Sequence, residues 1–173
     1  MLTPNILFFQ DASVYTGSDE ERDDINSVAK DSLIICRRNI CKARPILEYL
    51  QVPGPWDFHK SLLKLHGCVT STPLAFQIMV NLGFNPIIFC GVDCNSKGEN
   101  FFGPTDKHKD SFIDRTTEGL KWCESQAVRL KKELICCSDN GILPYTPIGD
   151  VMAKLEDCEQ DREFYMDKLR IDK

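Results

Sequence analysis

Apolar residues in this chain gather in short runs separated by polar or helical segments. Runs of this kind predict buried strands at 5–10, 32–36, 86–90 and 133–137, with a shorter one at 62–66. The segment 41–50 is ambiguous, because Pro45 permits a short helix from there to Leu50. Because strands alternate with helical segments, we expect an α/β fold. The expected form is a three-layer α/β domain with a mostly parallel central sheet of about five strands.

The segment that follows residue 70 carries the clearest helix pattern. Leu74, Ile78 and Leu82 recur every four residues, and other apolar residues widen this face. Hydroxyl residues of the N-cap kind and a proline precede the pattern, and Gly83 ends it. We therefore predict a largely buried helix that leads into the strand at 86–90.

A second helix is predicted from Phe112 to Leu130, with Ile113, Leu120 and Val128 on its apolar side. A further helix is expected to begin within 149–155. We therefore predict one domain over 1–155, followed by a charged tail at 156–173 that is expected to be helical.

Composition and charge narrow the function classes. The net charge of −5 and the pI near 5.2 give no electrostatic basis for non-specific nucleic-acid binding. No apolar run approaches the ~20 residues that span a bilayer. The first residues show no basic segment followed by an apolar one, so we expect no signal peptide and a cytoplasmic protein.

Nine cysteines are scattered along the chain, and an odd, dispersed set does not indicate a disulfide framework. Cys36, Cys90 and Cys136 lie within apolar runs, where we expect them to behave as small buried hydrophobes. The spacing of Cys90 and Cys94 is not that of a zinc knuckle, and no histidine follows at ligand distance. We therefore expect reduced thiols and no metal.

Polar residues follow three of the predicted strands at their carboxyl ends. Asp11 follows the first run, Gly91 and Asp93 follow the run at 86–90, and Ser138 follows the run at 133–137. In open α/β sheets, ligands bind outside the carboxyl ends of the strands. These residues are candidate nucleotide contacts, although Asp11 fits an ordinary turn equally well.

Two further features point to the same edge. Thr70, Ser71 and Thr72 stand at a helix start, where free N–H groups and hydroxyls can seat a phosphate. The long polar loop after Asp93 carries aromatic residues and His108, so it is a candidate lid. His108 titrates near neutral pH and is a candidate general base, and the alternative is a surface histidine between two lysines.

The most specific pattern is the sequence from Thr70-Ser71-Thr72 through Leu82-Gly83-Phe84 to Gly91-Val92-Asp93. With the order of elements from about residue 5 to residue 142, it resembles the Rossmann-like domain of bacterial family 42 sialyltransferases. The same domain occurs in motility accessory factors that act in flagellin glycosylation and in archaeal 6-hydroxymethylpterin diphosphokinase-like proteins.

The resemblance to the sialyltransferases implies a transferase that uses a nucleotide-sugar donor, such as a CMP-sugar, without a metal. It implies that the hydroxyls at 70–72 contact the nucleotide and that His108 deprotonates an acceptor hydroxyl. The chain departs from these relatives in two places. No Gly-x-Gly-Pro-Ser loop precedes Asn5, so either the chain is truncated or another element completes the site. The tyrosines expected after Gly91-Val92-Asp93 are missing, and Phe101 and Phe102 stand nearby.

Three functions follow from these observations. The first is a glycosyltransferase-like enzyme with a glycan or small-molecule acceptor. The second is a diphosphokinase of the 6-hydroxymethylpterin type, which needs ATP, Mg²⁺ and carboxylates such as Asp11 and Asp93 near the phosphates. The third is a catalytically silent binding module that lacks the phosphate loop. The sequence leaves open whether the chain forms a homo-oligomer.

Overall fold

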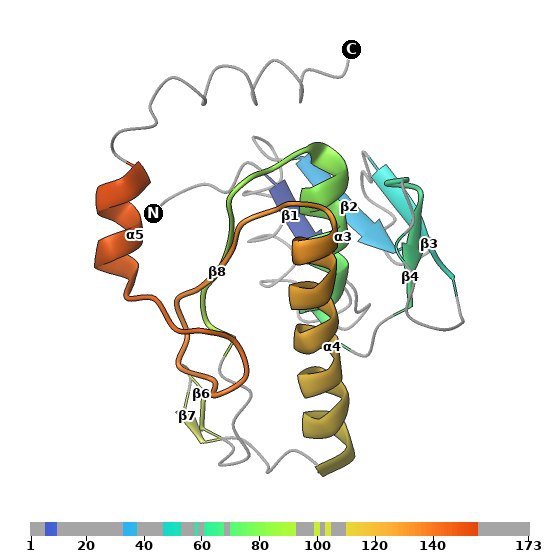
Figure 1. Cartoon of the computed structure of the whole chain (residues 1–173). Helices are drawn as coiled ribbons and strands as arrows, with labels where there is room; N and C mark the ends of the chain where they lie inside the picture. The colour runs from blue at the N-terminus through green and yellow to red at the C-terminus, as the bar shows by residue number, and fades with distance from the viewer. Residues whose placement is uncertain are drawn as a thin grey trace.

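The computed structural model of the chain (Figure 1) describes residues 6–9, 33–37, 47–52, 58, 61–67, 70–92, 99–100, 103–104 and 110–155. The structural statements below concern these residues. They form helices and strands, and strands that are far apart in the sequence pair side by side. The α/β character of the chain, with parallel strands, is therefore confirmed.

Four strands form the larger sheet, in the order β1 (Ile6–Phe9), β2 (Leu33–Arg37), β3 (Leu47–Val52) and β4 (Lys64–His66). All three neighbouring pairs are parallel. β3 pairs with β2 through its first half and with β4 through its second half. It therefore joins two ladders into one sheet.

The strand β3 settles residues 47–50 of the segment 41–50, whose sequence is ambiguous because Pro45 permits a short helix. Glu48 and Tyr49 pair with Cys36 and Arg37 of β2, and the Tyr49 side chain is fully buried. The local sequence allows a helix, but pairing with strands on both sides and the burial of a large aromatic residue favour the extended form. Residues far away in the sequence therefore determine the secondary structure of this segment.

A second parallel pair joins β5 (Ile87–Phe89) to β8 (Leu134–Cys136). The loop after β5 contains a short antiparallel pair, β6 (Glu99–Asn100) and β7 (Gly103–Pro104). Within the described ranges, no ladder joins β4 to β5, so the parallel strands form two sheets.

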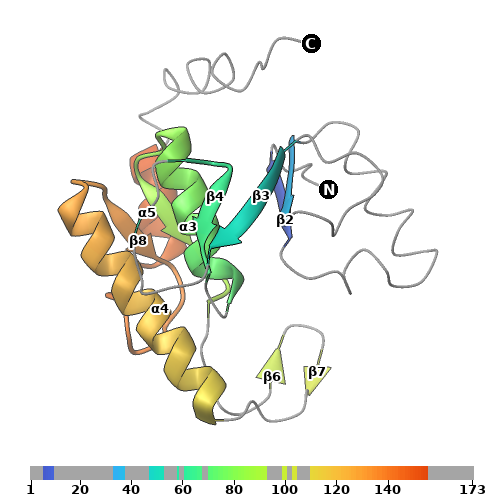
Figure 2. The same ribbon diagram turned by 90° about the vertical axis from the view of Figure 1, so that its right-hand side faces the viewer.

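The helix α3 (Ser71–Leu82) stands between the larger sheet and the helix α4 (Asp110–Arg129), as Figure 2 shows. Leu74 and Ile78 of α3 pack into one core with residues of β2, β3 and β4. Phe76 of α3 packs into a second core with β5, β8 and α4, where its ring lies 6.1 Å from that of Trp122. The prediction of a largely buried helix here is confirmed.

The helices α3 and α4 end in the same way. In each, two N–H groups beyond the last turn donate back to carbonyls of that turn, which is the Schellman arrangement. Phe84 and Gly83 donate to Met79 and Val80, and Lys132 and Lys131 donate to Ala127 and Val128. The residue in the left-handed conformation is Gly83 in α3, as predicted, but a lysine, Lys131, in α4.

The predicted apolar side of α4 is confirmed at Leu120 and is wrong at Val128. Val128 is 76% exposed, whereas Leu120, Cys123 and Ala127 are buried. These three lie three and four residues apart and face β5 and β8. The short helix α5 (Ile148–Leu155) follows, with Val151 buried. No helix among the described residues is both long and apolar enough to cross a membrane.

Candidate functional site

The carboxyl ends of β5 and β8 and the first turn of α3 lie at one edge of the molecule. α3 ends at Leu82, only a few residues before β5 begins, and its Phe76 ring meets the ring of Phe89 edge to face, with 6.3 Å between the centroids. α3 therefore runs antiparallel to β5, and its amino end is directed toward the carboxyl end of that strand. This is the edge where ligands bind in α/β folds.

The segments that follow β5 and β8 are held together by Ser138. Its Oγ accepts a hydrogen bond of 2.9 Å from the Val92 N–H, and the residue is only 6% exposed. Gly91 precedes this contact with a φ of 71°, which a glycine adopts without strain. The structure thus brings Gly91 and Ser138, both predicted site residues, to the same place.

Asn140 completes this connection and was missed by the sequence analysis. Its Nδ2 donates to the Val92 carbonyl at 3.1 Å, and its Oδ1 accepts from the N–H groups of Ile142 and Leu143 at 3.0 Å each. The side chain fixes the turn that holds Ser138. The only sequence signal was its place in Ser138-Asp139-Asn140-Gly141, a composition typical of turns.

The hydroxyl residues at the start of α3 are placed as predicted, but they do not cap the helix as expected. Thr70 has the extended N-cap conformation, with φ −120° and ψ 159°, yet its side chain makes no capping hydrogen bond. Ser71 is exposed and Thr72 is half-buried. The first turn carries no acidic residue, so the positive end of the helix dipole has no carboxylate of that turn beside it.

Two thiols lie directly beyond the β5–β8 ladder. Phe89 and Cys136 are the last paired residues, so Cys90 and Cys137 occupy the next matched positions. Cys36 and Cys136 are buried as predicted, but Cys90 is exposed. Successive side chains of a strand point to opposite faces, so Cys90 faces away from the core that holds Phe89. Partial burial, together with the charge of Cys90 and a hydrogen bond to its thiol, raises the pKa of Cys137.

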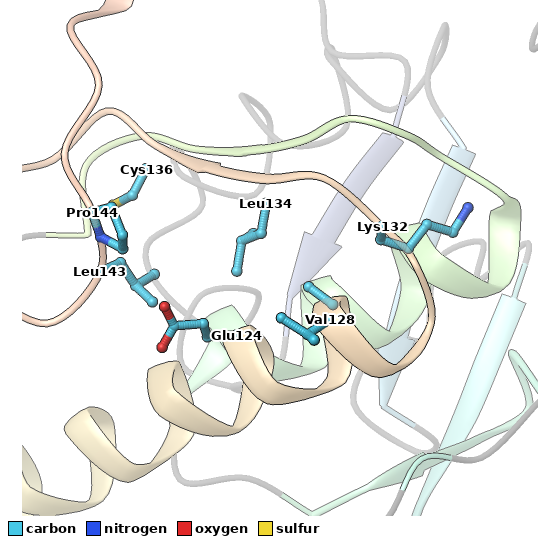
Figure 3. A pocket seen from close by; sticks show the side chains of 8 residues that line it. Glu124, Val128, Lys132, Leu134, Cys136, Leu143 and Pro144 are labelled. Atoms are coloured by element: carbon cyan, nitrogen blue, oxygen red, sulfur yellow. The ribbon is translucent and has the colours of Figure 1, made fainter.

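A cavity of about 170 Å³ lies between α4 and β8 (Figure 3). Glu124 and Lys132 lie at opposite ends of its lining, and the Lys132 side chain extends away from Glu124 and donates to the Gly83 carbonyl at 3.3 Å. Ligand pockets usually have a volume of ≈300–1,000 Å³. This cavity is smaller and holds no convergent set of polar groups, so we interpret it as a packing gap between helix and strand.

Three predicted site residues, Asp11, Asp93 and His108, lie outside the described residues. Across the residues that are described, no group of three or more His, Cys, Asp and Glu side chains could hold a metal ion. A scan against protein-family models, a search of curated proteins and a search of solved structures each found no match to the chain. The family resemblance therefore rests on the sequence motifs alone.

Proposed function

We propose that the chain is a metal-independent, glycosyltransferase-like protein that binds a nucleotide-sugar donor at the carboxyl ends of β5 and β8. The proposal includes a Rossmann-like, three-layer organisation, in which the β5–β8 pair and the larger sheet act as parts of one nucleotide-binding domain. It is supported by the direction of α3, whose amino end is turned toward the edge where β5 ends, and by the Ser138–Val92 hydrogen bond that joins the segments after β5 and β8.

Electrostatics at the start of α3 support a phosphate there. The first N–H groups of a helix have no partner within the helix, and the dipole places partial positive charge at that end. Because no acidic side chain occupies this turn and Thr70 does not cap it, a phosphate would meet donors without a competing carboxylate of the same turn. Ser71, exposed at the first helical position, would add a hydroxyl donor.

The chemistry that we propose is transfer of a sugar to a hydroxyl of a glycan or small-molecule acceptor. His108 would take the proton from that hydroxyl, whose oxygen then attacks the anomeric carbon of the donor. The bond from that carbon to the nucleotide phosphate breaks, and the nucleotide leaves with the negative charge. The donor amides at the start of α3 would stabilise this charge.

Thermal denaturation with nucleotides tests the proposal. CMP, CDP, UDP, GDP and ATP are each added with and without Mg²⁺, at concentrations up to the millimolar range. A ligand at a hundred times its Kd stabilises the protein by about 2.7 kcal/mol. We expect a metal-independent response to CMP or CDP. It should be lost in Thr70→Ala/Ser71→Ala and kept in Ser125→Ala, which removes a hydroxyl of α4 bonded only within its own helix.

The alternatives give different results in the same experiment. A response to ATP that requires Mg²⁺ would replace the transferase with a diphosphokinase of the pterin type. No response to any nucleotide would refute both enzymes and leave a binding module without catalysis. If CMP or CDP binds, loss of transfer in His108→Ala with nucleotide binding unchanged would support His108 as the general base.

A further inference from the structure

The thiols of Cys90 and Cys137 are held next to each other by contacts on both sides. On one side, the Cys137 N–H donates to the Phe89 carbonyl at 2.7 Å, which extends the β5–β8 ladder up to the pair. On the other side, the Val92 N–H donates to Ser138 Oγ at 2.9 Å. The two cysteines therefore lie between two fixed cross-strand contacts.

This placement suits a disulfide. Neighbouring strands lie about 4.8 Å apart, and disulfides join residues whose Cα atoms are about 4.4–6.8 Å apart. Both side chains project from the same face, because Phe89 and Cys136, one residue earlier on each strand, are both buried on the other face. Cys90 is exposed and Cys137 is partly exposed, so a small reagent can reach the pair.

The two thiols are not equivalent. Cys137 is more buried than Cys90, and its pKa is raised by burial and by the neighbouring Cys90, so Cys137 tends to keep its proton. The thiolate is the nucleophile in thiol–disulfide exchange, and attack requires access. The exposed Cys90 is therefore suited to react first, and Cys137 is suited to resolve the intermediate.

We propose that Cys90 and Cys137 form a reactive dithiol that is oxidised by low-molecular-weight disulfides of the glutathione class. The Cys90 thiolate attacks one sulfur of the reagent, whose S–S bond breaks, and one glutathione thiolate leaves and takes up a proton. Cys137 then loses its proton and attacks the Cys90 sulfur, which expels the second glutathione. The protein dithiol is oxidised by two electrons, and the reagent is reduced to two thiols.

The proposal is independent of nucleotide binding, so its test uses no nucleotide. The chain of residues 1–173, with Cys41, Cys68, Cys94 and Cys158 changed to Ser, is incubated with oxidised glutathione near pH 8, close to the ordinary thiol pKa of about 8.5. Disulfides are then located by peptide mass spectrometry with fragmentation. The wild-type chain is mapped in the same way, so that the result does not depend on the four substitutions.

We expect loss of both the Cys90 and Cys137 thiols and a cross-link between their peptides, while the buried Cys136 and Cys123 stay reduced. In Cys137→Ser, glutathione should remain attached to Cys90. In Cys90→Ser, the cross-link should be lost and Cys137 should react more slowly than Cys90 does. Separate glutathione adducts on the two cysteines, a cross-link through Cys136, or no reaction in both folded proteins would overturn the proposal.

Discussion

The side chain of Gln77 substitutes for a neighbouring strand at the open edge of β4. Its Oε1 accepts the His66 N–H at 2.8 Å, and its Nε2 donates to the carbonyls of His66 and Pro73 at 3.3 Å each. Both residues are buried. A backbone N–H of a sheet edge is thus satisfied in the core by a helix side chain rather than by water.

Replacing Gln77 with Met keeps the length of the side chain and its helix propensity but removes these hydrogen bonds. Loss of the hydrogen bond that the buried His66 N–H donates to Gln77 costs about 1–3 kcal/mol. The His66 carbonyl loses its bond to Nε2 as well, so we expect Gln77→Met to lower the free energy of unfolding by about 2–3 kcal/mol. In a chain of this size, each kcal/mol shifts Tm by roughly 2–4 °C.

Gln126 provides a matched control. Its Oε1 is buried on α4 with no hydrogen-bond partner among the described residues. The same substitution there removes an unpaired polar atom, so Gln126→Met should leave stability unchanged or raise it slightly. Urea unfolding followed by tryptophan fluorescence gives both values, since Trp122 lies in one of the two cores. Equal effects of the two substitutions would refute the reasoning.

Three further predictions concern helix ends, the turn after β8 and pH. Both helix-end positions, Lys131 and Gly83, have positive φ, which glycine adopts without strain. Lys131→Gly should therefore raise the free energy of unfolding by about 1 kcal/mol, and Gly83→Ala should lower it by about as much. Urea midpoints that move in the same direction in the two variants would contradict this. Asn140→Ala should lower the free energy of unfolding by about 1–3 kcal/mol, measured in the same way. Asn140→Asp should lower it less, because aspartate keeps the Oδ1 acceptor. A larger loss of stability in Asn140→Asp than in Asn140→Ala would be inconsistent with the acceptor role. Burial and the neighbouring Cys90 raise the pKa of Cys137 above that of an ordinary thiol, so its contribution to stability is complete below the ordinary pKa and is lost as pH rises through the raised one. In Cys137→Ser the urea midpoint should therefore fall less steeply at alkaline pH, and an unchanged slope would exclude this contribution.

The elements that local sequence controls were predictable. The burial of α3, its start close to the hydroxyl residues and the proline, and its termination at Gly83 follow from apolar spacing, proline and glycine within a dozen or so residues of one another. β3 was not predictable in this way. Its extended form depends on pairing with β2 and β4, and the local sequence after Pro45 is equally compatible with a helix.

The candidate site likewise contains residues that the local sequence predicts and residues that it does not. Residues at the carboxyl ends of strands, such as Gly91 and Ser138, could be predicted because position along the chain is enough to find them. The exposed face of Cys90 could not, since a run that is apolar throughout gives no alternation to assign faces. Asn140 and Gln77 act on partners that are 48 and 11 residues away, and no local pattern marks such contacts.

The position of α3 has a consequence for how the protein opens. One side of this helix completes the core under the larger sheet, and another side completes the core with β5, β8 and α4. Separation of either core from α3 would expose residues such as Leu74 or Phe76, which are otherwise fully buried. Sub-global opening of one half is therefore costly, and the two halves should unfold as one cooperative unit. In native-state hydrogen exchange, the amides in the middle of α3 should then exchange only through global unfolding, later than those of α5.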